Sequence, residues 1–396
     1  MSFWKITIPK RLLIPLLLIL AAKVAGAVYI NYSMNIQASG TFWSDPSRVY
    51  NWEQNKVFQA NTVTIGNWPL MFLGWDSAWY MNIMMKGYGF STQSYAFSPA
   101  LPFLAMITNF GLQNPFVSIT VVALVFGVLW IPFYQLLAED YLDKKSAFLS
   151  ALLMAFSPYL FVFTTVAYSE GLFLFFVLGA LLLLKRGKWF SASALAAVAP
   201  LTRIMGIIVI FPMLYCALKQ KQDKIRNVLL SLTPGASLTA LFAYFGFTAG
   251  DFLAPVHTSE WSYMYSFRTL LTEGIPLQGV NALQEVLYHP SGTPLNWLLP
   301  IALVVFLIFP LLLFRIIWTK DRSLGLYVFI GYCGILGFGA LASTPRYVSV
   351  LFPLWLASAN SSVSKKSIVI ASVIMCVFYI IALDLWMNFL NGQFIA

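Results

Sequence analysis

The sequence predicts an all-α polytopic membrane protein, and its composition is the first observation that leads to this fold class. Of the 396 residues, 60% are hydrophobic and only 10% are charged, whereas soluble domains are roughly 45–50% apolar and about 25% charged. The mean hydropathy is accordingly high, at +0.78. The second observation is that apolar runs with the length of bilayer crossings recur along the chain. A soluble enzyme is therefore excluded.

Short basic clusters between the apolar runs are the third observation, and they predict the topology. Cytoplasmic loops carry an excess of Lys and Arg, so each cluster is placed on the cytoplasmic side. The net charge of +10 then reflects topology rather than nucleic-acid binding. The clusters are Lys5 with Lys10 and Arg11, Lys144 with Lys145, Lys185 with Arg186 and Lys188, Lys219 with Lys221, Lys224 and Arg226, Arg315 with Lys320 and Arg322, and Lys365 with Lys366.

With every cluster inside, each interval between clusters holds an even number of crossings, and the chain makes about 11 in total. The first run, from Leu12 to Ile30, is longer than the apolar region of a signal peptide and is interpreted as a retained crossing. The others are 116–137, two in each of 146–184, 189–218, 227–316 and 323–362, and a last one over 367–386. The paired intervals break near Tyr168, near Arg203, in a polar loop over 250–296 and at Pro345.

The first outer loop, about 31–115, contains two further segments. Residues 76–90 predict an amphipathic helix along the membrane surface, with one face formed by Trp79, Tyr80, Ile83 and Met84. Residues 97–112 are apolar but short and contain two prolines, so we expect a re-entrant or interfacial segment. We predict one membrane domain over 1–396, whose outer loops 31–115 and 250–296 form the functional face.

Four unusual ionisable residues fall at the outer ends of different helices: Asp76, Glu170, Arg203 and Arg346. Ionisable groups near a bilayer are costly and are kept where they pair, line a wet cavity or act on a substrate. We therefore predict that the four residues share one cavity that opens outward.

Each of the four also has a purely structural interpretation. Arg203 would snorkel to the interface, and Glu170 would sit at a helix N-terminus, where the dipole favours an acid. Asp76 would act as a helix N-cap. For Arg346 this interpretation is weaker, because Pro345 fixes the entry to its helix.

Two arginines and a carboxylate at an outer face suit glycosyl transfer from a lipid phosphate. A guanidinium binds phosphate through a planar fork, and a carboxylate beside it accepts the proton of an acceptor hydroxyl. The arginines then stabilise the charge on the leaving phosphate. The alternative is a flippase or transporter of lipid-linked saccharides, but a transporter is expected to have related halves and a charge near the bilayer midplane.

Five segments, taken in order, carry a family resemblance. They are GWDSAWYMNIMMKGY (74–88), FSPALPFLAMI (97–107), SPYLFVFTTVAYSEGLFLFFVLGALLLLKRGKW (157–189), PLTRIMGIIVIFP (200–212) and TPRYVSVLFPLW (344–355). Together they resemble the PIG-V type mannosyltransferases, the GPI mannosyltransferase 2 family and its prokaryotic relatives, within the GT-C class of membrane glycosyltransferases. Family members commonly read FFPLYP where this chain reads FSPALP (97–102), a departure that bears on the acceptor more than on the reaction.

The resemblance implies a GT-C type helix bundle with catalytic roles for Asp76 and Glu170. It implies a polyprenyl- or dolichyl-phosphate mannose donor, a lipid-linked or surface glycan acceptor, and an inverting displacement without cofactor or metal. The predicted substrate-binding residues are Trp75, Trp79, Tyr80, Tyr168, Arg203, Arg346 and Tyr347. The protein would lie in the cell membrane of a prokaryote, or in the ER membrane of a eukaryote, with its site on the extracytoplasmic face.

Two other groups of ionisable residues are given no catalytic role. Lys23, within the first crossing, would snorkel outward or pair with a carboxylate such as Asp384. His257 and His289, which have acids nearby, match no metal-ligand spacing.

Overall fold

The computed structural model describes residues 9–37, 65–257, 298–337, 343–359 and 363–390, and every regular element within these ranges is a helix. The first half contains α1 (Lys10–Gln37), η2 (Ile65–Phe72), α3 (Asp76–Lys86), η3 (Thr92–Ala96), α4 (Ala100–Leu112), α5 (Pro115–Ala138), α6 (Lys144–Phe156), α7 (Pro158–Phe163) and α8 (Glu170–Lys185). The second half contains α9 (Trp189–Thr202), η4 (Ile204–Val209), α10 (Ile210–Lys219), α11 (Lys224–Ser231), α12 (Thr233–Ala249), α13 (Ala254–His257), α16 (Leu298–Lys320), α17 (Arg322–Gly337), α18 (Thr344–Ser349), α19 (Pro353–Ser358) and α20 (Lys365–Leu390). The predicted all-α class is confirmed.

Four helices within the described ranges are long and apolar enough to cross a membrane: Lys10–Ser33 of α1, α5, Lys224–Ala249 over α11 and α12, and α20. Each of them overlaps a predicted crossing. Shorter apolar helices such as α9 and α17 occupy other predicted crossings. The chain is therefore an integral membrane protein, while the number of crossings stays a prediction.

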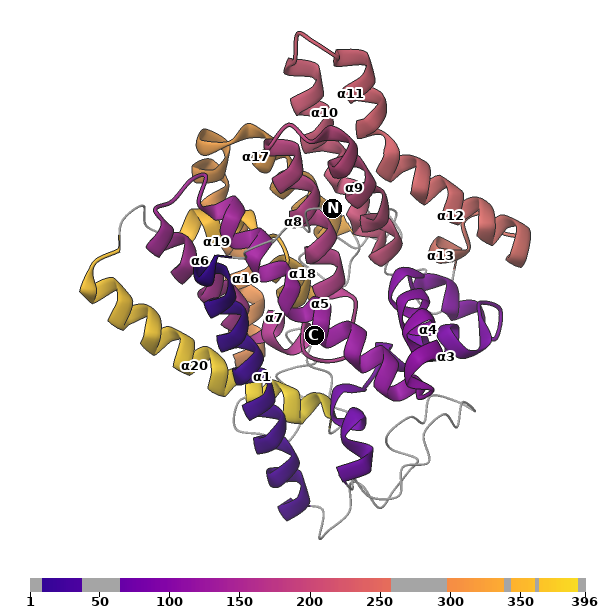
Figure 1. Cartoon of the computed structure of the whole chain (residues 1–396), viewed down its shortest axis with the longest axis vertical. Coiled ribbons are helices and arrows are strands. Elements are labelled where there is room, and N and C mark those ends of the chain that lie inside the picture. The colour runs from indigo at the N-terminus through magenta and orange to yellow at the C-terminus, as the bar shows by residue number, and fades with distance from the viewer. Residues whose placement is uncertain (1–8, 38–64, 258–297, 338–342, 360–362, 391–396) are drawn as a thin grey trace, which may run out of the picture.

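Helix α8 lies at the centre of the bundle and packs most closely against α5 and α9 (Figure 1). It has an acid in its first turn and a base in its last, which matches the helix dipole. Near its N-terminus the backbone of α5 approaches closely, since a Cβ on Gly171 would lie 2.7 Å from the Cα of Gly127. Small residues allow such close crossings between membrane helices. The start of α8 is thus held firmly against α5.

The remaining helices surround this centre in two groups. On one side, α1 and α20 pack with α6 and α7, and on another, α3 and α4 pack on α5 (Figure 1). Helices α10 and α11 form the far end of the molecule in the same view. The segments that lead into α3, α8 and α18 therefore meet between the groups.

The predicted amphipathic helix of the first outer loop is α3, but its apolar side is not free to lie on lipid. Tyr80 and Ile83 are buried in one hydrophobic cluster with residues of α4 and α5 such as Leu101 and Ile119. The helix is confirmed, and the prediction that its apolar side faces lipid is wrong because α4 and α5 cover it. Helix α4 has 13 residues, fewer than the roughly 20 that span a bilayer.

The C-terminal end of α8 lies among ion pairs that tie basic clusters to acids: Lys185 with Asp321 (2.6 Å), Arg186 with Asp140 (2.9 Å) and Arg11 with Glu139 (3.1 Å). Basic residues from two separate parts of the chain, Arg11 and the adjacent Lys185 and Arg186, thus lie at one end of the bundle. The predicted topology, which places all basic clusters on one side, is compatible with this arrangement and stays a prediction.

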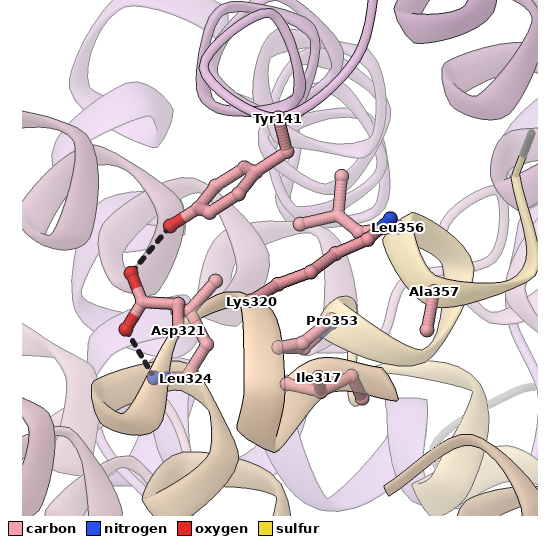
Figure 2. Close-up of a pocket in the computed structure, with 8 residues that line it drawn as sticks. All are labelled: Tyr141, Ile317, Lys320, Asp321, Leu324, Pro353, Leu356 and Ala357. Carbon is pink, nitrogen blue, oxygen red and sulfur yellow. Dashed lines mark hydrogen bonds between the residues drawn. The ribbon is translucent and has the colours of Figure 1, made fainter. Parts of the chain in front are cut away.

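Asp321 is the centre of this end, and with its partners Tyr141, Lys185, Ser323 and Leu324 it forms what we call the Asp321 cluster. One oxygen accepts from the Tyr141 hydroxyl and the Lys185 ammonium, each at 2.6 Å, and the other accepts from Ser323 and Leu324. Figure 2 shows the bonds to Tyr141 and Leu324. Burial opposes ionisation, but the bonds from Lys185, Ser323 and Tyr141 outweigh it and hold the pKa of Asp321 well below its usual range. A small pocket beside the cluster is lined by Tyr141, Ile317, Lys320, Asp321, Leu324, Pro353, Leu356 and Ala357.

Candidate active site

At the other end of α8, four breaks in the helices bring the predicted ionisable residues together. Asp76 begins α3 and Glu170 begins α8. Arg203 lies in the break between α9 and η4, where its backbone is extended (φ −156°, ψ 136°). Arg346 lies in the first turn of α18, directly after Pro345, the second residue of this short helix. Each side chain thus leaves its element where the helical ladder is interrupted.

Glu170 is the centre of the group. Its Oε1 accepts hydrogen bonds from Arg203 Nη1 at 2.6 Å and from Arg346 Nε at 2.5 Å. Arg346 reaches on with Nη1 to Asp76 Oδ2 at 3.2 Å. Two acids and two arginines therefore form one chain of charge-assisted hydrogen bonds, which we call the Glu170 cluster.

Access to the cluster increases from Glu170 towards its ends. The side chain of Glu170 is 1% exposed and that of Arg346 is 7% exposed, whereas Arg203 is 15% and Asp76 is 26% exposed. The second oxygen of Glu170, Oε2, is buried and has no hydrogen-bond partner within the described part of the chain. The cluster therefore keeps unused acceptor capacity at its centre and an accessible carboxylate at one end.

Aromatic rings hold the two guanidinium groups in place. Arg346 lies 4.5 Å from the ring centroid of Phe163 and 4.6 Å from that of Tyr168. The ring of Tyr347 contacts both arginines, at 5.3 Å for Arg203 and 5.6 Å for Arg346. Cation–π contacts are stronger where the cation is desolvated, so these rings favour one orientation of each fork.

Asp76 is not a helix cap, which corrects the structural interpretation from the sequence. Trp75 occupies the cap position, and no side chain caps this helix. The backbone N–H of Asp76 instead donates to the Tyr168 hydroxyl at 3.0 Å. Trp75 has φ 48° and ψ −114°, a conformation that costs a non-glycine residue about 1–3 kcal/mol and is found mainly at functional sites.

The surroundings of Asp76 make its carboxylate more basic. Burial raises the pKa of Asp76, and the Arg346 guanidinium lowers it by less than burial raises it. The nearby charge of Glu170 raises the pKa further. A carboxylate with a raised pKa is a better proton acceptor, so the site suits general-base chemistry.

The predicted aromatic residues fall into two groups. Tyr168 and Tyr347 contact the cluster directly, and Tyr80 reaches it through Ser169, whose hydroxyl lies 3.0 Å from the Tyr80 hydroxyl. Trp79 takes another place, stacked between Phe90 and Phe97 in the packing of α3. Trp75 lies next to Asp76 in the chain.

Sequence analysis missed two residues of the site. Ser169 bonds Arg203 Nη1 at 3.3 Å as well as Tyr80, and its place between Tyr168 and Glu170 was the available signal. Phe163, which contacts Arg346, belongs to an apolar run and carries no signal of its own.

The other ionisable residues are placed differently from expectation. Lys23 neither snorkels nor pairs with Asp384, because its ammonium bonds Thr164 inside the bundle, while Asp384 accepts from Asn388. His257 pairs with Asp251 at 2.9 Å, and His289 and Glu260 lie outside the described residues. No group of three or more His, Cys, Asp and Glu side chains in the described part of the chain could hold a metal ion.

Comparison with known families decides the identity of the chain. A family model described as Mannosyltransferase (PIG-V) matches residues 55–266, more than half of the chain. The chain belongs to the PIG-V mannosyltransferase family. The matched range of this PIG-V family member contains Asp76, Glu170 and Arg203 but ends before Arg346. No curated protein matches the chain.

The solved structures that are similar to this PIG-V family member are larger. The oligosaccharyltransferase of Archaeoglobus fulgidus in its apo form has a TM-score of 0.48 and 16% identity, over 96% of this chain and 56% of that one. The same values of TM-score and identity apply to the Archaeoglobus fulgidus enzyme in complex with an inhibitory peptide and a dolichol-phosphate, over 93% of this chain and 56% of that one. The chain thus spans just over half the length of these proteins.

Proposed function

We propose that this PIG-V family member transfers a mannosyl residue from a polyprenyl- or dolichyl-phosphate carrier to a hydroxyl of a lipid-linked or surface glycan. The observation that carries the proposal is the Glu170 cluster, in which one buried carboxylate holds two arginines and a second, partly exposed carboxylate lies at the end of the chain of ion pairs. Membership of the family supports mannose as the sugar.

Arg203 and Arg346 are the proposed ligands of the donor phosphate. Oε1 of Glu170 fixes one nitrogen of each guanidinium, and Asp76 accepts from a second nitrogen of Arg346, so both arginines are oriented while further N–H groups remain to bond a ligand. A fork that is oriented before the ligand arrives loses little freedom on binding. We assign Glu170, which the sequence predicted as catalytic, to positioning these arginines, since its side chain is 1% exposed.

Asp76 is the proposed general base, because it is the most exposed carboxylate of the cluster and has a raised pKa. In the proposed step, the acceptor oxygen attacks the anomeric carbon while Asp76 takes the hydroxyl proton. The bond between the anomeric carbon and the phosphate oxygen breaks, and the lipid phosphate leaves with that electron pair. A direct displacement of this kind inverts the anomeric centre.

Arg346 contacts the proposed base, Asp76, and is also a proposed ligand of the leaving phosphate. In the free protein its Nη1 bonds Asp76 Oδ2, and protonation of Asp76 removes the negative charge from that oxygen. At the same moment the leaving phosphate gains a negative charge. A guanidinium released by Asp76 can then follow the charge to the phosphate, which is stabilisation concentrated in the transition state.

We place the reaction on the extracytoplasmic face. The Glu170 cluster lies at the N-terminus of α8, and the ion-paired basic clusters lie at its C-terminus. Sixteen helical residues separate the two clusters by about 24 Å, somewhat less than the roughly 30 Å thickness of the hydrocarbon core. If the basic residues face the cytoplasm, the Glu170 cluster lies on the extracytoplasmic side of the cell or ER membrane.

The test uses purified full-length protein in nanodiscs, radiolabelled polyprenyl-phosphate mannose and n-octyl α-mannoside as the acceptor probe. We expect transfer from the lipid donor and none from GDP-mannose. Asp76→Asn keeps the shape of the side chain but not its basicity, so kcat falls by about 10² to 10⁴ fold.

Asp140→Asn is the matched control, because Asp140 is also ion-paired to an arginine and is 25% exposed, but lies at the other end of α8. We expect its kcat to stay within about twofold of wild type. If Asp76→Asn keeps more than about a tenth of the wild-type turnover, Asp76 is not the base. Movement of the labelled lipid across the bilayer without transfer would instead favour the flippase alternative.

A further inference from the structure

Lys23 is the most unusual buried charge outside the Glu170 cluster. It lies within the membrane-spanning part of α1, and its side chain is 1% exposed. Its ammonium donates to the backbone oxygen of Thr164 at 2.6 Å and to the Thr164 hydroxyl oxygen at 2.9 Å, and lies 5.5 Å from the ring centroid of Phe161. An apolar side chain would be far less costly at this depth, so packing alone does not account for a lysine.

The acceptor lies where a helix ends. Thr164 follows the last residue of α7, and the carbonyls at a helix C-terminus have no partner within the helix. The Thr164 hydroxyl is already used as a donor to Leu160, so it presents a lone pair to Lys23. A lysine ammonium is suited to such carbonyls both as a donor and as a positive charge at the negative end of the helix.

The segment that starts at Thr164 leads directly to the proposed site. Residues 164–169 are buried throughout. The N–H of Ala167 donates to the carbonyl of Phe72 at 2.7 Å, four residues before Asp76. The Tyr168 hydroxyl then accepts from the Asp76 N–H, and Ser169 accepts from Arg203. This segment is therefore bonded both to the start of α3, which carries Asp76, and to Arg203, which lies in the break between α9 and η4.

Helix α5 completes the surroundings of the Thr164 carbonyl. A Cβ at Gly127 would overlap that oxygen and would lie 3.4 Å from the Lys23 ammonium. The carbonyl thus fits between a glycine of α5 and the lysine of α1, and Gly127 also faces Gly171 of α8. Two helices, α1 and α5, thus enclose one backbone oxygen at the start of the segment, and α8 packs against the same glycine.

We propose that Lys23 is a positioning residue for the transfer reaction, which holds the Thr164 carbonyl and so fixes the segment that presents Tyr168, Ser169 and Glu170 to the site. This inference rests on the proposed function. It assigns the lysine no contact with the substrate.

The test compares Lys23→Met, which removes the donor, with Lys23→Gln, which keeps a neutral donor, and Lys23→Arg, which keeps a charged one. Transfer from polyprenyl-phosphate mannose to n-octyl α-mannoside is measured together with hydrogen exchange of amides 165–169. For Lys23→Met we expect a 10- to 100-fold lower kcat, since misplacement of about 1 Å costs on this order. We expect a smaller rise in the donor KM and faster exchange in this segment. Protection and kcat should both increase from Met to Gln to Arg.

Arg11→Met is the matched control, because Arg11 is a cation of the same helix that forms an exposed ion pair with Glu139 at the other end of the bundle. Its kcat and the exchange of amides 165–169 should match wild type. The inference is overturned if Lys23→Met keeps kcat within about threefold of wild type, or if kcat falls while these amides stay protected. If Lys23→Met does not fold, the kcat and the amide protection of Lys23→Gln and Lys23→Arg, each compared with wild type, test the inference in its place. Exchange does not depend on transfer, so a failure of the proposed reaction would show separately in Asp76→Asn.

Discussion

Helix α8 has an ion-pair cluster at each end, buried at Glu170 and partly buried at Asp321, and the two clusters differ in how completely their acids are bonded. At the C-terminal end, both oxygens of Asp321 accept hydrogen bonds, from Lys185, Tyr141 and the start of α17. At the N-terminal end, Oε1 of Glu170 takes both arginines while Oε2 has no partner in the described part of the chain. Asp76, at the edge of that cluster, is 26% exposed.

We infer from this difference that the Asp321 cluster has a structural role and the Glu170 cluster a chemical one. An ion pair whose hydrogen bonds are all satisfied holds its elements together and has few groups left to bond a ligand. A cluster in which one carboxylate oxygen has no partner and a second carboxylate is partly exposed can form hydrogen bonds to a ligand. We therefore expect substitutions in the Asp321 cluster to affect stability, and substitutions in the Glu170 cluster to affect transfer as well.

The largest contrast is expected between Glu170→Gln and Asp321→Asn. Loss of a buried ion-pair partner costs about 3–5 kcal/mol, so Glu170→Gln should melt at lower temperature, and Asp321→Asn, which loses a partly buried partner, should melt lower by a smaller amount. Glu170→Gln also releases the two arginines, and we expect kcat/KM for transfer to fall by about 10² to 10³ fold. Asp321→Asn should keep kcat/KM within about threefold. Equal losses of transfer in the two variants would contradict a separation of roles.

A smaller contrast is expected between Arg346→Lys and Lys185→Arg. Lysine keeps the charge of Arg346 but cannot bond Glu170 and a second oxygen with one rigid fork. We expect the donor KM to rise about tenfold, or roughly 1.4 kcal/mol. Lys185→Arg keeps a donor for Asp321 and should leave the donor KM unchanged. An unchanged donor KM in Arg346→Lys would make Arg346 structural.

Acidification should act on the two ends in opposite directions. The pKa of Asp76 is raised above the ordinary value of about 3.9, so its contribution favours the folded state at low pH and is lost as pH rises through the folded pKa. The pKa of Asp321 is lowered, so its contribution is present above the unfolded pKa and is lost as pH falls through the folded one.

Transfer should follow Asp76 alone, since a protonated base is inactive. We expect kcat/KM to fall about tenfold per pH unit below the raised pKa of Asp76 in the free protein. The measurement is a pH profile of kcat/KM for wild type and Asp321→Asn, with melting temperatures over the same range. A profile whose acid limb moves with Asp321→Asn would show that the two ends are coupled.

The smallest effect is expected for Ser169→Ala. It removes hydrogen bonds to Arg203 and Tyr80, which are worth about 1 kcal/mol, and kcat/KM should fall by about three- to fivefold. Ser323→Ala, which removes a hydroxyl from the Asp321 cluster, is the control and should leave kcat/KM unchanged. Similar values for the two variants would remove Ser169 from the site.

The sequence was sufficient to select the four charged residues that the structure brings together. A bilayer makes unpaired charges costly, and the basic clusters assign each loop to a side. The sequence could not predict how these residues pair, because Arg346 lies 176 residues from Glu170 and 270 residues from Asp76. No local sequence pattern predicts that both arginines bond the same oxygen of Glu170, or that its other oxygen has no partner within the described residues.

The sequence also could not predict contacts between side chains and backbone groups. The sequence offers Lys23 either the interface or a carboxylate partner, but its partner is a carbonyl at the end of α7. The structural interpretation of Asp76 as a helix cap follows from its residue type, whereas the chain enters α3 through an unusual conformation at Trp75. Both errors concern the backbone path between helices, which hydrophobic periodicity does not describe.

The range shared with the PIG-V family ends at residue 266, yet Glu170 and Asp76 are both bonded to Arg346. The range by which the family is recognised therefore does not contain the whole Glu170 cluster. A fragment that stops at the family boundary would keep two acids and one arginine, with Asp76 deprived of its guanidinium. Searches or truncations guided by that boundary alone would discard the residue that links the proposed base to the phosphate.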